Sequence, residues 1–150
     1  MSKTPYETDF YAWVTEQAGH LRAKRWEALD LDNLIGELDT LGRSERNALW
    51  SQLRILLVHL LKWRYQPERR TRSWRGSITR ARQNVTRRLQ QHSLRRELPD
   101  FITEAYADAR RLAADQTGLP LSTFPKMCEW PEEEIEHVEF LPKAIGEETP

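Results

Sequence analysis

A basic segment beginning at Lys62, "KWRYQPERRTRSWR", contains the residues best suited to chemistry. Arginines alternate there with Trp and Tyr, and its only acidic residue is Glu68. Lys and Arg side chains neutralise anionic groups such as phosphates, and exposed aromatic rings can stack on bases. We expect five arginines of the turn and the outward helix face to meet a partner: Arg69, Arg70, Arg72, Arg80 and Arg87. The segment therefore predicts a non-enzymatic binding module for nucleic acid or for an acidic protein segment.

The helical wheel favours a second, structural interpretation of the same charges. At about 100° per residue around an apolar stripe centred on Ile78, Arg75 and Arg82 fall beside the stripe, so the charges ring the helix. Such flanking arginines commonly lay their stems on apolar surface and pair with carboxylates. Trp63 and Trp74 are in register with apolar stripes, which predicts core positions rather than stacking platforms.

The distribution of charge along the chain supports a third alternative. The formal net charge is +0, yet residues 62–96 carry a net +11, residues 1–61 a net −2 and residues 97–150 a net −9. A chain segregated in this way either binds an anionic partner or neutralises itself. The acidic C-terminal arm could cover the basic helix within one copy or between copies of a homo-oligomer, which would be a structural or oligomeric role.

A polar pocket between helices is the remaining alternative, and it would suit an enzyme or a binder of a small ligand or metal. His59 lies inside an apolar stretch of helix, where a neighbouring carboxylate and burial can shift a histidine pKa. We expect His59, Asp39 and Arg75 to converge there if such a pocket exists. The residues leave open whether the chain is an enzyme.

Recognisable metal and cofactor motifs are absent from the sequence. The acidic block "DLDNLIGELD" fails as a calcium-binding EF-hand loop, because Leu34 and Ile35 occupy the positions that need an oxygen ligand and Gly. A di-iron bundle needs two Glu-x-x-His motifs, and only Glu134 and His137 match. Glu16 and His20 share a helix face, as a single-metal site would require, without further support. We predict no metal and no cofactor.

Helical periodicity dominates the first two thirds of the chain. An N-terminal helix has Thr4 or Thr8 as candidate caps. A long central helix follows Asp30 or Asp32 and ends at Pro67, with a bend or break expected at Gly42. Between Ile55 and Leu61 apolar residues surround this helix, as in helices buried by several partners.

Two more helices and an arm complete the predicted fold. The third helix spans about residues 73–92, and the fourth starts at Pro99 and stops at Gly118. The Pro-rich remainder predicts an arm with one turn at residues 131–136. The fold class is therefore all-α, an irregular four-helix bundle around a long central helix with an extended Pro-rich C-terminal arm packed on it.

Length and composition predict a single cytoplasmic domain. The 150 residues suit one domain, with residues 1–118 as the helical bundle and residues 119–150 as the C-terminal arm. The longest strongly apolar run, "ILLVHLL", is far shorter than the roughly 20 residues of a membrane span, so we expect no membrane association. We read no signal peptide, and the single cysteine, Cys128, suits a reducing compartment.

Several blocks in order resemble a known family: "YETDFYAWVTEQAGHLRA", "LDLDNLIGELDTLGRSER", "LRILLVHLLKWRYQPERRTRSW" and "AYADARRLAADQTGLPLSTFP". They look like the bacterial family known as domain of unknown function twenty-nine, over roughly residues 5–142. The resemblance implies an all-helical fold and no established activity. One departure is visible, because the family pattern leads us to expect Glu where this chain has Gly36, before Glu37. A site that needs a carboxylate at position 36 is not supported.

Overall fold

The structure, a computed structural model, describes residues 5–147. Every regular element in this range is a helix and none is a strand, which confirms the predicted all-α class. In chain order the α-helices and 3-10 helices are α1 (Pro5–Thr8), α2 (Phe10–Arg22), η1 (Trp26–Ala28), α3 (Leu31–Tyr65), η2 (Pro67–Arg69), α4 (Arg72–Arg88), α5 (His92–Arg96), α6 (Leu98–Thr117), η3 (Leu121–Thr123) and α7 (Glu132–Glu136).

The chain divides into two compact units at Ser44 and Glu45. Unit 1 contains α1, α2, η1 and the first part of α3, and unit 2 contains the remainder of α3 and all later elements. We describe each unit by itself. The grouping of residues 1–118 and 119–150 within one domain stays a prediction.

Unit 1 is organised by hydrogen bonds where α2 turns back into α3. The Asp9 carboxylate caps α2 by accepting from the Ala12 amide, and the alternative cap at Thr4 lies outside the described residues. The Trp13 indole nitrogen donates to Asp30 Oδ2 (3.0 Å), and the Asp30 amide donates to the Gln17 side chain (2.8 Å). Asp30 is thus the polar centre of the unit as well as the residue before α3.

Helix α3 is unbroken from Leu31 to Tyr65, so the expected bend or break at Gly42 is wrong. A glycine in a helix interior lowers helix stability by about 1 kcal/mol, which is small beside the hydrogen bonds of a helix this long. The predicted end before Pro67 is confirmed. The C-terminal half is buried on most sides, as the surrounding apolar pattern predicted, through Leu49, Leu53, Leu56, Leu57, Val58, Leu60 and Leu61.

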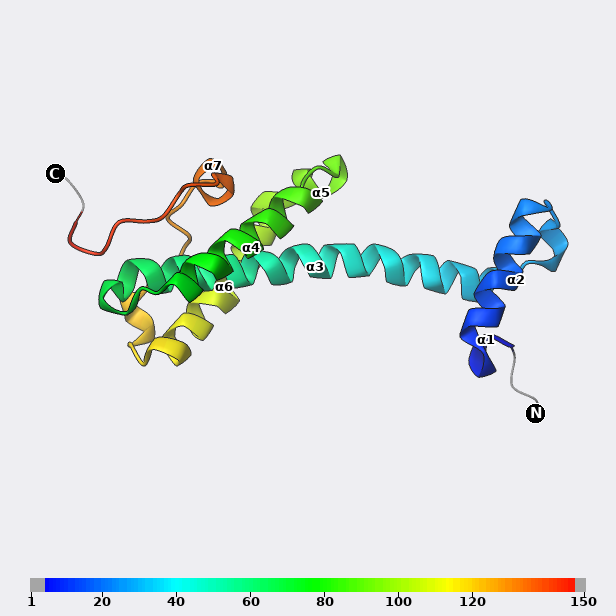
Figure 1. The fold of residues 1–150 in the computed structure, drawn as a ribbon, viewed down its shortest axis with the longest axis horizontal. Helices are drawn as coiled ribbons and strands as arrows, with labels where there is room; N and C mark the ends of the chain where they lie inside the picture. Colours follow the sequence, from blue (N-terminus) through cyan, green and yellow to red (C-terminus); the bar gives the residue numbers. More distant parts are fainter. Residues whose placement is uncertain (1–4, 148–150) are drawn as a thin grey trace. The chain divides into compact units, whose positions relative to one another are not determined.

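Helices α4 and α6 share a hydrophobic core with the C-terminal half of α3, and the three lie close together in Figure 1. Ile78 and Val85 of α4 and Ala105 and Ala109 of α6 are among its buried side chains. The third helix is shorter than predicted, since α4 ends at Arg88 and α5 follows separately. The predicted stop of α6 is confirmed at Gly118, whose φ of 75° is one that glycine adopts without strain.

The C-terminal segment, residues 119–147, contributes large side chains to the same core. Phe124, Trp130 and Ile135 are buried in it. The Tyr106 hydroxyl of α6 donates to the carbonyl oxygen of Pro125 (2.5 Å), which ties the start of the segment to the helix. The single turn predicted at residues 131–136 is confirmed as α7.

Candidate functional site

The basic turn is built by the residues that end α3 and begin α4. Pro67 starts η2, which carries Arg69. The hydroxyl of Thr71 then accepts a hydrogen bond from the Trp74 amide (3.1 Å) and caps α4. Because a capped helix begins directly after the turn, Arg69 and Arg72 are held on two adjoining rigid elements.

Two cations of the basic segment form cation–π contacts with aromatic rings of the same segment. The Lys62 ammonium lies 4.6 Å from the ring centre of Trp74, and the Arg70 guanidinium lies 4.8 Å from that of Trp63. The Arg70 Nε also donates to the Trp63 carbonyl (2.9 Å). Arg70 is therefore a half-buried turn residue rather than the free partner-binding group that we expected. Trp63 and Trp74 are both partly covered, so neither is an open stacking platform.

Arg82 fixes the C-terminal segment to α4. Its side chain is only 4% exposed, and the guanidinium donates to three backbone carbonyls, those of Ile135 (2.8 Å), Val138 (3.3 Å) and Phe140 (2.9 Å). Burial lowers the pKa of Arg82, but an arginine stays charged in a protein. A buried cation thus replaces its lost hydration with three aimed carbonyl dipoles instead of a carboxylate.

Two further arginines are neutralised by carboxylates of the same segment. Arg95 forms a bidentate pair with Glu136, with nitrogen–oxygen distances of 2.9 and 3.3 Å. The Arg64 Nε lies 2.9 Å from a carboxylate oxygen of Glu129. Glu136 and Glu129 of the C-terminal segment thus pair with two arginines of residues 62–96 within one copy.

Five exposed arginines of η2 and α4 remain outside these contacts. We call Arg69, Arg72, Arg75, Arg80 and Arg87 the arginine face; none of them forms an ion pair within residues 5–147 in the structure. The four on α4 fall within an arc of about 140°. Arg87 alone has a side-chain hydrogen bond, from Nη2 to the Asn84 side-chain oxygen (2.9 Å). The sequence places arginines on all sides of α4. Because the C-terminal segment, the core and the aromatic rings cover one side, the exposed arginines are confined to the other.

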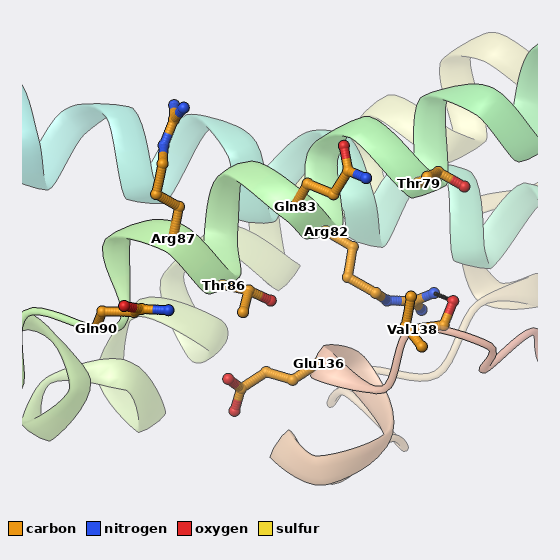
Figure 2. A pocket seen from close by; sticks show the side chains of 8 residues that line it. All are labelled: Thr79, Arg82, Gln83, Thr86, Arg87, Gln90, Glu136 and Val138. Atoms are coloured by element: carbon orange, nitrogen blue, oxygen red, sulfur yellow. Dashed lines mark hydrogen bonds between the residues drawn. The ribbon is translucent and has the colours of Figure 1, made fainter.

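A groove runs along α4 beside the C-terminal segment. One part of about 370 Å³ is lined by Thr79, Arg82, Gln83, Thr86, Arg87, Gln90, Glu136 and Val138. An adjoining part of about 320 Å³ shares Thr79, Arg82 and Val138 and reaches Arg75. In Figure 2, Arg82 extends toward Val138, Glu136 lies opposite Thr86 and Gln90, and Arg87 extends away from Glu136. The α4 wall of the groove carries hydroxyls, amides and guanidinium groups and no carboxylate.

The family model described as "Domain of unknown function DUF29" matches residues 5–141. The chain belongs to the DUF29 family. No curated protein and no solved structure matches it. Among the described helices of this DUF29 protein, none is both long and apolar enough to cross a bilayer.

The residues expected to form the His59 pocket lie in different settings. His59 is half-buried in α3, its Nδ1–H donates to the Ile55 carbonyl (2.9 Å), and burial lowers the pKa of the ring. Arg75 is exposed and lines one part of the α4 groove. Asp39 is exposed in unit 1 of the DUF29 chain. Neither part of the α4 groove is lined by His59, and the pocket around it stays a prediction.

His20 and Glu16, the candidates for a single-metal site, contact protein groups. His20 Nε2 lies 3.5 Å from Glu16, as their spacing predicted, while His20 Nδ1 accepts a hydrogen bond from Arg25 (3.2 Å). In the part of the DUF29 chain that the structure describes, no three His, Cys, Asp or Glu side chains are grouped for a metal ion. Cys128 is partly buried and burial raises the pKa of its thiol, which disfavours the reactive thiolate.

Sequence reasoning placed Arg82 beside the apolar stripe but missed its partners. The helical wheel places Arg75 and Arg82 in equivalent positions beside the stripe, whereas in the structure Arg75 is exposed and Arg82 is buried. The available signal was position: Arg82 follows Ile78 by one helical turn, directly after buried Ala81. No sequence pattern marks backbone carbonyls as ligands, because every residue has one.

Proposed function

We propose that this DUF29 chain is a non-enzymatic protein-binding module that takes an acidic, extended segment of a partner protein on the arginine face and in the adjoining α4 groove. The observation that carries this proposal is the arginine face: its five exposed side chains on η2 and α4 have no carboxylate partner among residues 5–147. Exposed, unpaired guanidinium groups are free to make bidentate bonds to partner carboxylates.

The chain's own C-terminal segment supports this choice of partner. Around residues 135–140 it carries Glu136 and Glu139, leaves α7 and turns at Val138 and Glu139, and α4 and α5 hold it by the Arg82–carbonyl bonds and the Arg95–Glu136 pair. These contacts are an intramolecular example of the proposed chemistry. A partner segment would find the same kinds of donor on the open side of α4, in Thr79, Gln83 and Arg87.

Nucleic acid is the less favoured partner for two physical reasons. The rings that could stack on bases, Trp63 and Trp74, are partly buried and covered by Arg70 and Lys62. Duplex DNA carries one charge per about 1.7 Å of axis, and the carboxylates of Glu136 and Glu139 border the groove and would repel it. A peptide carries fewer charges and can also place apolar side chains against Val138.

Fluorescence anisotropy can test the proposal with two labelled probes, a peptide of alternating Glu and Val and a duplex DNA. We expect the peptide to bind and its affinity to fall as salt is raised from about 50 to 200 mM, because the contact is ionic. The double variant Arg80→Glu with Arg87→Glu should weaken peptide binding by about tenfold, since two attractive contacts become repulsive.

Arg111→Glu is the matched control, because Arg111 is an exposed arginine of α6 whose side chain, within the described residues, is hydrogen-bonded to the Ala107 carbonyl of its own helix. It should leave peptide affinity within about twofold of the parent. Binding of the DNA but not the peptide, binding of neither probe, or equal losses in the α4 and Arg111 variants would each overturn the proposal.

A further inference from the structure

A seven-residue repeat runs along the exposed side of α4. Residues 79–83 are Thr-Arg-Ala-Arg-Gln and residues 86–90 are Thr-Arg-Arg-Leu-Gln, so that Thr, Arg and Gln recur in the same order. Seven residues are close to two turns of helix, about 10.5 Å along its axis, and bring a side chain back to within about 20° of the same direction. The α4 groove and its edge therefore present two half-sites with the same three types of side chain.

Hydroxyl and amide groups of this repeat form the α4 wall of the groove. Gln83, Thr86 and Gln90 all line it, and within residues 5–147 their side chains have no hydrogen-bond partner. An amide side chain offers both donors and an acceptor, which match the C=O and N–H groups of a peptide main chain. The wall thus suits a partner whose main chain makes no hydrogen bonds of its own.

The two edges of the groove carry opposite charges. Along one edge the C-terminal segment, held by Arg82, contributes Glu136 and Glu139. Because they lie about 140–160° around the helix from Arg82, Arg80 and Arg87 flank the other edge. Figure 2 shows Arg87 extending away from Glu136. Acidic side chains of a partner are therefore repelled by the first edge and attracted to the second.

The distance between the two arginines favours one backbone conformation. Arg80 and Arg87 are about 10.5 Å apart along α4. Side chains on one face of a β-strand recur at about 6.8 Å and then at about 13.6 Å. In a polyproline II segment every third side chain lies on the same side, at about 9.3 Å, and the main chain has no internal hydrogen bonds. A flexible arginine side chain can accommodate the small difference from 10.5 Å.

An α-helical partner also meets the distance, since residues seven positions apart are about 10.5 Å apart in a helix. Its N–H and C=O groups are already bonded to each other, however, so Gln83 and Gln90 would find no main-chain partner. The polyproline II conformation is the one that satisfies both the arginines and the amides.

From the repeat, the amide wall and the charged edges, we infer that the α4 groove binds its acidic partner in the polyproline II conformation, with acidic residues three positions apart. The main chain lies along Gln83, Thr86 and Gln90, and the two acidic side chains bind Arg80 and Arg87. This rests on the function proposed above and adds to it the conformation and the residue spacing of the partner.

Fluorescence anisotropy with three labelled peptides of identical composition tests the spacing. Each peptide has two glutamates in a framework of proline and alanine, which favours an extended chain, and the glutamates are two, three or four positions apart. The peptide with a separation of three should bind the full chain about threefold to fivefold more tightly than the other two. This is the factor expected when one of two exposed ion pairs is lost.

Variants of the groove separate the arginine contacts from the main-chain contacts. Arg80→Gln and Arg87→Gln should each remove the preference for a separation of three, because a single arginine cannot distinguish one spacing from another. Gln83→Ala with Gln90→Ala should weaken all three peptides by a similar factor and keep the preference. Arg111→Gln, at an exposed arginine of α6, is the matched control and should keep both the affinity and the preference.

The possible outcomes distinguish the spacing from the proposed function. Equal affinity for the three peptides, or a preference that persists in both arginine variants, would overturn the spacing and leave an acidic partner in place. Unchanged affinity in the glutamine variant would overturn the main-chain contact. Binding of the alternating Glu and Val peptide, without binding of any of these three, would overturn the polyproline II conformation. If all four peptides fail to bind, the proposed function and this inference are both wrong.

Discussion

Replacing Arg82 with Met should loosen the C-terminal segment from α4. Met keeps an unbranched, apolar stem on the buried side of α4 but ends about two atoms before the guanidinium nitrogens. The change removes the donors that bind the carbonyls of Ile135 and Phe140, together with the longer bond to Val138. It therefore separates the hydrogen bonds of the guanidinium from the packing of its stem.

The expected magnitude follows from where the three carbonyls lie. The bond to Ile135 is buried, so its oxygen would lose its partner without gaining water, whereas the other two bonds are half-buried and their oxygens can be rehydrated. Hydrogen bonds from a charged donor contribute about 1.5–3 kcal/mol each. Part of this is offset because Met avoids the cost of burying a cation. We expect the free energy of unfolding to fall by about 3 kcal/mol.

Urea unfolding followed by circular dichroism measures this loss, and limited digestion with a Glu-specific protease reports release of residues 129–139. The control is Arg80→Met, which removes an exposed arginine of the same helix without an ion pair and should change stability by less than about 0.5 kcal/mol. If Arg82→Met is no less stable than the control and is cleaved no faster, then the guanidinium does not fasten the segment and the reasoning fails.

Two further predictions concern other polar contacts. Hydrogen bonds from Asn33 and then from Trp13 hold the pKa of Asp30 below its ordinary value, so this carboxylate stabilises unit 1 at neutral pH and the contribution is lost as the pH falls through the folded-state pKa. Asp30→Asn should lower the urea midpoint at pH 7 more than at pH 3; an equal drop at both would contradict this. Burial raises the pKa of Tyr106, so this tyrosine should be absent from a spectrophotometric titration between pH 9 and 11. Tyr106→Phe should lower the free energy of urea unfolding by about 1 kcal/mol, because the hydrogen bond to Pro125 is lost. The same variant should leave the titration curve between pH 9 and 11 unchanged, and a change there would contradict the assignment.

The helices of unit 2 could be predicted because local and tertiary signals agree there. Ile78 and Val85 lie on one face at helical spacing and are buried, and Gly118 ends α6 where a left-handed residue is needed. Thr71, which caps α4, precedes the predicted start by two residues. These features depend on neighbours within one turn of helix, which a sequence reading can see.

The division of the chain could not be predicted in this way. Leu31, Leu38 and Leu41 continue the three-and-four spacing of the buried leucines that follow, yet they are exposed in the single chain. Periodicity identifies which face of a helix is apolar but carries no information about what covers it. The partners of Arg82 were hidden for a related reason, since an irregular segment has no periodicity that would place it on one side of α4.

Arg82 donates its hydrogen bonds to main-chain atoms, and this has a consequence for the evolution of the C-terminal segment. Because the bonded groups are the carbonyls of Ile135, Val138 and Phe140, the anchor does not depend on which side chains residues 136–139 carry. Val138 and Glu139 are exposed and contribute to the wall of the groove. Substitutions there can alter the charge or shape of the groove while its position is kept. The same fold can therefore diversify in what it recognises without first losing stability.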